Sequence, residues 1–193
     1  MVTPDVLRRA NSQPAVQAII ARLAKDSLIR RTINLLSDLE PVPGQPTLLR
    51  LTFLPPNRQN KPHEISLAAR VSRTLNKVLV MTGETTAIDA FCLADGQPIQ
   101  LKCIQKDNPH LPPGNVVDAA KDARQSAHDQ GVGWKGIWVY IESPRNVAVI
   151  RQRWSQKGTQ PELTANDLDG TISKVIVYAS DGEVELPLVL PRP

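Results

Sequence analysis

Three polar side chains near the middle of the chain have the types and spacing needed to hydrolyse a phosphodiester bond. Asp89 lies in one predicted strand, and Gln100 and Lys102 lie two residues apart in the next. A carboxylate and an amide carbonyl are hard oxygen ligands of the kind that Mg²⁺ binds. A lysine beside such an ion would help to deprotonate water and balance charge on the scissile phosphate. The spacing therefore predicts a metal-dependent nuclease site that uses Mg²⁺ or Mn²⁺.

The geometry of this site depends on a predicted hairpin. Strands at 87–93 and 98–104 flank Asp95-Gly96, a strong turn signal. A two-residue turn there would place Asp89 opposite Lys102. Because side chains alternate along a strand, the three polar residues would share one face and the other face would be apolar. The alternative interpretation is a solvent-exposed face on which Asp89 and Lys102 form only a structural ion pair.

The same register makes two further predictions about the hairpin. Phe91 would lie opposite Gln100, on the polar face. Pro98 would lie opposite Leu93, at a non-hydrogen-bonded pair, where a missing backbone N–H is tolerated.

The elements around the hairpin predict an α/β protein. Helical spacing predicts helices at 14–24, 26–39, 64–75, 115–130 and 146–154, and strand patterns occur at 47–54, 77–81, 136–142, 172–179 and 183–190. Proline, 17 of 193 residues, falls mostly at the joints, including a break at 41–46. The order helix, three strands, helix, strand predicts a mixed sheet flanked by helices. We expect an N-terminal helical region (1–46), an α/β core (47–160) and a C-terminal extension that carries a hairpin (161–193).

This order of elements and residues resembles the PD-(D/E)xK nuclease superfamily over about residues 62–143. The resemblance implies a restriction-endonuclease-like core with four catalytic residues. Asp89 would be the metal-binding acid and Lys102 the motif lysine. Glu64 would be the acid that many members carry on the first helix, and it would also bind metal. Gln100 stands where the family usually has Asp or Glu; it would bind metal through its one carbonyl oxygen, with one negative charge fewer.

A second resemblance concerns the following helix and strand. Residues 115–127 and 136–141 are similar to C-terminal toxin domains of bacterial polymorphic and contact-dependent inhibition systems. This implies cleavage of DNA or tRNA in a competitor cell and a cognate immunity protein in the producer. A housekeeping or mobile-element endonuclease is equally compatible with the core.

Composition supports a polyanionic partner and excludes a membrane protein. The net charge is +4, and Arg145, Arg151 and Arg153 on or beside one helix could bind phosphates, although a solvated helix face is the alternative. No apolar run of 18 residues and no N-terminal signal core occur. Cys92 and Cys103 predict free thiols in a reducing cytoplasm.

Two functions of other classes stay open at this point. One is a non-catalytic nucleic-acid-binding module in which Gln100 marks the loss of the metal. The other is a non-enzymatic interaction protein, such as an immunity or adaptor protein, in which the polar residues of the hairpin are only structural.

Overall fold

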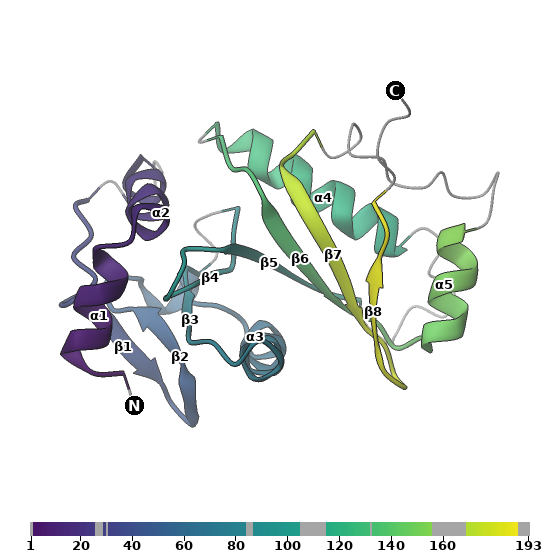
Figure 1. Cartoon of the computed structure of the whole chain (residues 1–193), viewed down its shortest axis with the longest axis horizontal. Helices are drawn as coiled ribbons and strands as arrows, with labels where there is room; N and C mark the ends of the chain where they lie inside the picture. Colours follow the sequence, from purple (N-terminus) through teal and green to yellow (C-terminus); the bar gives the residue numbers. More distant parts are fainter. Residues whose placement is uncertain are drawn as a thin grey trace. The chain divides into compact units, whose positions relative to one another are not determined.

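The computed structural model (Figure 1) describes residues 2–25, 29, 31–83, 87–104, 115–131, 133–155 and 169–188. Within these residues the chain is an α/β protein with five α-helices and eight strands, paired both parallel and antiparallel. The predicted fold class is therefore confirmed. The chain divides into two compact units, Met1–Ile99 and Gln100–Pro193, called here the N-terminal unit and the C-terminal unit. The division falls within one strand, β5.

The N-terminal unit begins with two helices and continues with strands that surround a crossover helix. Its elements are α1 (Pro4–Asn11), α2 (Pro14–Lys25), β1 (Leu39–Val42), β2 (Gln45–Leu51), a short 3₁₀-helix η1 (Pro56–Arg58), α3 (Pro62–Leu75), β3 (Leu79–Met81), β4 (Ala90–Cys92) and the start of β5 (Pro98–Cys103). Strands β1 and β2 are antiparallel, and β2 and β3 are parallel, joined by α3. Strands β3, β4 and β5 follow as antiparallel neighbours.

The predicted break at 41–46 is wrong, because the prolines there close a hairpin between β1 and β2. Gly44 has φ +72°. A turn with proline in its second position and a positive φ at its third is of type II, which Pro43-Gly44 can adopt without strain. Proline thus marks a chain reversal here.

The helix predicted at 26–39 is wrong where the chain is described. Residues 31–38 form turns and bends, and β1 begins at Leu39; residues 26–28 and 30 lie outside the described part. The carboxylate of Asp38 is buried and accepts hydrogen bonds from the Arg31 guanidinium (2.8 Å) and the backbone N–H of Asn34. Such side-chain bonds to nearby groups compete with helical hydrogen bonds, which explains the error.

Helix α3 confirms the helix predicted at 64–75 and begins two residues earlier, at Pro62. Proline suits the first helical position because its missing N–H would have no helical partner there. The buried stripe of α3 includes Leu67, Ala68 and Val71, and the helix packs against β2. Asn76 ends it in the left-handed conformation, with φ 51°.

The C-terminal unit continues β5 and adds two helices and three strands. They are α4 (Asn115–Asp129), β6 (Ile137–Glu142), α5 (Val147–Ser155), β7 (Ile172–Tyr178) and β8 (Glu183–Leu186). Strands β6 and β7 are parallel, and β7 and β8 form the expected C-terminal hairpin. Helix α4 packs on β6 and β7, and α5 packs on β8 (Figure 1). The loop predicted at 107–114 lies outside the described residues.

Along the chain, α3, β3, β4, β5, α4 and β6 follow in the predicted order of helix, three strands, helix and strand. No helix within the described residues is both long enough and apolar enough to cross a membrane.

Candidate active site

Asp89 lies directly before β4 in a fixed backbone position. Its C=O accepts a hydrogen bond from the N–H of Thr82 (2.9 Å), and its own N–H donates to the C=O of Ile99 (2.9 Å). The Thr82 hydroxyl donates to the C=O of Ile88. Only 8% of Asp89 is exposed, so the interpretation of this position as part of a solvent-exposed face is wrong. The backbone on both sides of the carboxylate is therefore held in place.

A local irregularity accompanies this position. In the β4–β5 ladder Ala90 is the partner of Ile99, yet Asp89 also donates its N–H to the Ile99 carbonyl. Two successive residues thus lie against one residue of β5, which is the arrangement of a β-bulge. Bulges occur often beside active sites, where they change the direction of a side chain.

The predicted hairpin register is wrong by two residues. Phe91 pairs with Pro98 rather than with Gln100. A shift by two preserves the assignment of residues to faces, whereas a shift by one would reverse it. The ladder pairs end at Ala90 and Ile99, so the predicted pairing of Asp89 with Lys102 does not occur in this register.

A longer turn explains the different register. Cys92 donates its N–H to the C=O of Gln97 (3.0 Å) and accepts from the N–H of Gly96 (2.9 Å), which leaves four residues in the loop. Asp95 Oδ1 accepts from the N–H of Gln97 (3.2 Å), and Asp95 also pairs with the ammonium of Lys77. Gly96, at φ +68°, occupies the left-handed position that such loops require. The Asp-Gly signal located the turn but did not give its length.

Pro98 begins β5, as predicted, but its partner is Phe91 and not Leu93. The adjacent Gln97 carbonyl carries the hydrogen bond from Cys92. The Phe91–Pro98 pair is therefore of the non-hydrogen-bonded kind, where proline lacks no bond.

Gln100 and Lys102 lie on the part of β5 that belongs to the C-terminal unit. Only 6% of Gln100 is exposed, and its Oε1 has no hydrogen-bond partner among the described residues. Lys102 is half-buried. Being two residues apart in a strand, the two side chains project to the same side. An unpaired buried amide oxygen is unusual in a folded protein and calls for a ligand or a bound water.

Glu64 has a structural partner in this chain. Its Oε2 accepts hydrogen bonds from the backbone N–H of Lys61 (3.0 Å) and from Asn60 Nδ2 (3.1 Å), so it caps α3. Asn60 Oδ1 in turn accepts from the N–H of Gly83 (2.9 Å). Sequence reasoning selected neither Asn60 nor Gly83, because a bond between residues 23 positions apart leaves no local signal.

Among the residues described, no group of three or more His, Cys, Asp or Glu side chains is placed to hold a metal ion. An amide ligand such as Gln100 does not belong to these four residue types. The predicted metal role of Glu64 stays a prediction.

The three arginines predicted to bind phosphates lie in the C-terminal unit, at or on α5. Arg145 is half-buried and precedes the helix, and its C=O accepts from the N–H of Ser180 (3.0 Å). Arg151 is exposed and lines a hollow of about 400 Å³ between α5 and β8. Arg153 lies on α5, and its side chain is outside the described part of the structure.

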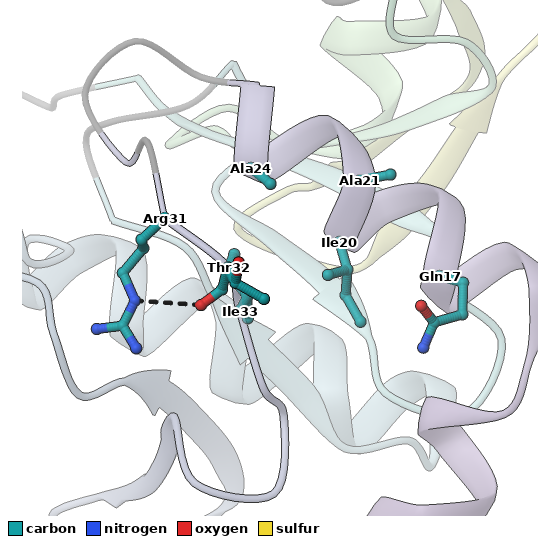
Figure 2. A pocket seen from close by; sticks show the side chains of 7 residues that line it. All are labelled: Gln17, Ile20, Ala21, Ala24, Arg31, Thr32 and Ile33. Atoms are coloured by element: carbon teal, nitrogen blue, oxygen red, sulfur yellow. Dashed lines mark hydrogen bonds between the residues drawn. The ribbon is translucent and has the colours of Figure 1, made fainter.

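A larger hollow, of about 610 Å³, lies beside α2 in the N-terminal unit (Figure 2). Its walls come from one side of α2 and from residues 31–33. Arg31 donates to Asp38 (2.8 Å), and its guanidinium lies 4.4 Å from the centre of the Phe53 ring. Neither Glu64 nor Asp89 lines this hollow, so it is distinct from the predicted site.

A cluster in the C-terminal unit gathers three basic side chains around one carboxylate. Asp169 lies 3.0 Å from His128 Nε2, 3.5 Å from Arg124 and 3.9 Å from Lys135, and it accepts from the Thr171 hydroxyl (2.6 Å). The Thr171 hydrogen bond, followed by the hydrogen bond and charge of His128 and the charge of Lys135, lowers the pKa of Asp169 to about 2. The cluster ties α4 to the start of β7.

Comparisons with family models, with curated proteins and with solved structures found no match for this chain.

Proposed function

We propose that this chain is a metal-dependent endonuclease that hydrolyses phosphodiester bonds of DNA or RNA, with Asp89, Gln100 and Lys102 in its active site. The observation that carries the proposal is the buried, unpaired Oε1 of Gln100, two residues before a half-buried lysine. Leaving such an acceptor unpaired costs about 1–3 kcal/mol. A cation, or a water bound to one, would remove that cost.

The donor set fits a hard divalent ion. The Asp89 carboxylate and the Gln100 carbonyl are both oxygen ligands of the kind that Mg²⁺ and Mn²⁺ prefer. Gln100 directly follows Ile99, whose C=O accepts from the backbone of Asp89. These two residues would hold the ion, and Glu64 is the third acid that the family resemblance suggests. When bound, the ion supplies positive charge for the scissile phosphate and acidifies water.

The remaining roles belong to the side chains themselves. The Lys102 ammonium balances the negative charge that develops on the phosphate oxygens in the transition state. The hydrogen bonds of Asp89 to Thr82 and Ile99 fix its position, so little reorganisation is needed when the substrate binds.

The biological setting follows from the resemblance alone. We propose an antibacterial toxin domain that acts on DNA or tRNA in the cytoplasm of a target cell and is neutralised by a cognate immunity protein in the producer. Purified immunity candidates encoded beside this chain would be tested for inhibition of cleavage.

The central test measures cleavage of plasmid DNA and of total tRNA by the purified protein in Mg²⁺, Mn²⁺ and EDTA. We expect cleavage that needs the divalent ion and falls at least about 100-fold in Asp89→Ala and Lys102→Ala. Asp95→Asn is the matched control, because it changes a carboxylate in the same hairpin but keeps the Oδ1 acceptor. Cleavage by both alanine variants at the wild-type rate would exclude this site.

A second candidate function is a nucleic-acid-binding module without catalysis. Gln100, an uncharged amide where the resembled family usually has Asp or Glu, is the observation that favours it. It predicts salt-dependent binding with no cleavage in any divalent ion. An interaction protein, the third class, predicts neither binding nor cleavage.

A further inference from the structure

The segment between β2 and α3 is basic and exposed. No acidic residue occurs in the 23 positions between Glu40 and Glu64. Residues 55–63, called here the basic segment, carry Arg58, Lys61 and His63, and all three side chains are exposed. Arg58 makes no side-chain hydrogen bond or ion pair within the described residues. An exposed basic segment with no acid among its own residues attracts polyanions, and the neighbouring Glu64 carboxylate contacts Asn60 and Lys61 rather than Arg58.

Hydrogen bonds to its polar neighbours hold the basic segment in one conformation. Asn60 accepts from the N–H of Gly83 (2.9 Å) and donates to Glu64 (3.1 Å). Gln59 accepts from Arg50 (2.9 Å), and the same arginine pairs with Glu40 (2.6 Å). Because the segment is held before any ligand arrives, little conformational entropy is lost when a ligand binds.

Gly83 brings the backbone of Arg58 close to the end of β3. A Cβ at position 83 would lie 2.3 Å from the Arg58 carbonyl oxygen, which is too close for any side chain. Gly83 also has φ +74°, a conformation that favours glycine. Because Gly83 has no side chain, the backbone of the basic segment can pack directly against it.

This packing places the basic segment close to Asp89. Asn60 is bonded to Gly83, and Asp89 is bonded to Thr82, the preceding residue. Two hydrogen bonds and one peptide unit separate the Asp89 carbonyl from the Asn60 amide, a span of at most about 10 Å. A nucleic acid strand carries one phosphate per about 3.4 Å of duplex axis. Asn60, in the basic segment, therefore lies within about three phosphate spacings of the Asp89 backbone.

We propose that the basic segment binds the phosphate backbone of the nucleic acid beside the bond that is cleaved, with Arg58 as the principal contact. The proposal rests on the proposed nuclease function for the identity of the ligand. Its physical basis does not depend on catalysis. It requires only that Arg58 is exposed, has no partner among the described residues and lies in a segment held near Asp89. Backbone contacts of this kind position the substrate without reading its sequence.

The test measures binding without cleavage, by fluorescence anisotropy of a labelled 20-base-pair DNA duplex in EDTA, with tRNA as competitor. We expect Arg58→Ala to weaken binding about fivefold at low salt and to reduce the slope of log affinity against log salt by about 1. Arg58→Lys, which keeps the charge, should retain most of the wild-type affinity and most of the wild-type salt slope. Arg73→Ala is the matched control, an exposed arginine in the last turn of α3, about 16 Å along the helix from Pro62.

The outcomes separate the two proposals. If the wild type cleaves and Arg58→Ala binds with unchanged affinity and slope, the basic segment is not the contact and the nuclease proposal stands. If no cleavage occurs but Arg58→Ala weakens binding as expected, only the nuclease proposal fails. An equal loss in Arg73→Ala would show a general charge effect and overturn the assignment, as would a wild type that binds neither DNA nor tRNA. Thermal melting checks that each variant is folded.

Discussion

The two units of this chain share the same local arrangement of strands and helix but differ in net charge. Each contains a parallel strand pair joined by a crossover helix, β2–α3–β3 in one and β6–α5–β7 in the other. Each extends this pair with an antiparallel hairpin, to β1 in the first and to β8 in the second. Similar βαβ units therefore do not by themselves indicate where a substrate binds.

Charge distinguishes the units clearly. Residues 1–99 contain 12 Lys and Arg against 8 Asp and Glu, a net charge of +4, whereas residues 100–193 contain 11 of each and are neutral. The excess positive charge of the whole chain thus belongs to the unit that carries Asp89 and the basic segment. Ion pairing does not distinguish the units, because basic side chains have acidic partners in both, as Arg50 has in Glu40 and Lys174 has in Glu185. If the chain binds nucleic acid as proposed, the difference in net charge favours a surface of the N-terminal unit over the arginines around α5.

The largest effect should come from comparing two glycines of positive φ, one in each unit. Gly83→Ala adds a Cβ 2.3 Å from a backbone oxygen, whereas a Cβ on Gly170 would meet no atom of the described residues within 4 Å. We expect Gly83→Ala to lower the free energy of unfolding by about 3 kcal/mol, from strain and overlap together. Gly170→Ala should cost about 1 kcal/mol, from strain alone. Urea denaturation measures both, and equal losses would contradict the close packing at Gly83.

Gln100→Glu should strengthen the proposed metal site, because it adds a negative charge at the position where the resembled family usually has an acid. We expect the affinity for Mn²⁺, measured by isothermal titration calorimetry, to rise about tenfold, because a second carboxylate strengthens a hard-cation site. Gln97→Glu adds the same charge elsewhere in the hairpin and serves as the control. Unchanged affinity in Gln100→Glu, or an equal rise in the control, would argue against Gln100 as a ligand.

The Asp169 cluster predicts a pH-dependent contribution to stability in the neutral unit. The pKa of Asp169 is lowered from 3.8 to about 2 in the folded chain. The stabilisation is therefore complete above about pH 4 and is lost as the pH falls towards 2. Asp169→Asn should cost about 1 kcal/mol at pH 7, allowing for solvent screening of a carboxylate that is about one-third exposed. Urea denaturation should show this difference disappearing by about pH 2, with Asp122→Asn on the exposed surface of α4 as the matched control.

The smallest effect should come from a single surface ion pair in the hairpin. Lys77 pairs with Asp95, and both side chains are at least one-third exposed. We expect Lys77→Met to change the free energy of unfolding by no more than about 0.5 kcal/mol, because solvent screens such pairs. A loss as large as that of Asp169→Asn would show that one exposed pair matters as much as the cluster of the neutral unit.

Most elements of the fold could be predicted from local patterns. The apolar stripe and Asn76 predicted α3, and the apolar run at 136–142 predicted β6. The wrong predictions at 26–39 and 41–46 share one cause. The N-terminal hairpin depends on a proline-glycine turn, and residues 31–38 depend on the buried Asp38. In both places a specific hydrogen bond or turn geometry overrode the average preference of the residues.

The candidate site was predicted in its residue types and only partly in its geometry. Alternation along one strand indicated that Gln100 and Lys102 share a side, which holds whatever the register of the hairpin. It could not give the four-residue loop, the bulge at Asp89 or the role of Glu64 as a cap. Each of these depends on which backbone group a residue bonds, the N–H of Lys61 for the cap, the C=O of Gln97 for the loop and the C=O of Ile99 for the bulge.

The sequence alone determined which residues have suitable chemistry, the order of the elements from α3 to β6 and the absence of acids before α3, because composition and short periodic patterns are local properties. Only the tertiary structure decided that the Gln100 oxygen is buried and unpaired and that Gly83 joins the basic segment to the strand end beside Asp89. Burial and hydrogen-bond partners depend on residues far apart in the chain, and the positions of those residues are fixed only when the strands and the crossover helix pack together.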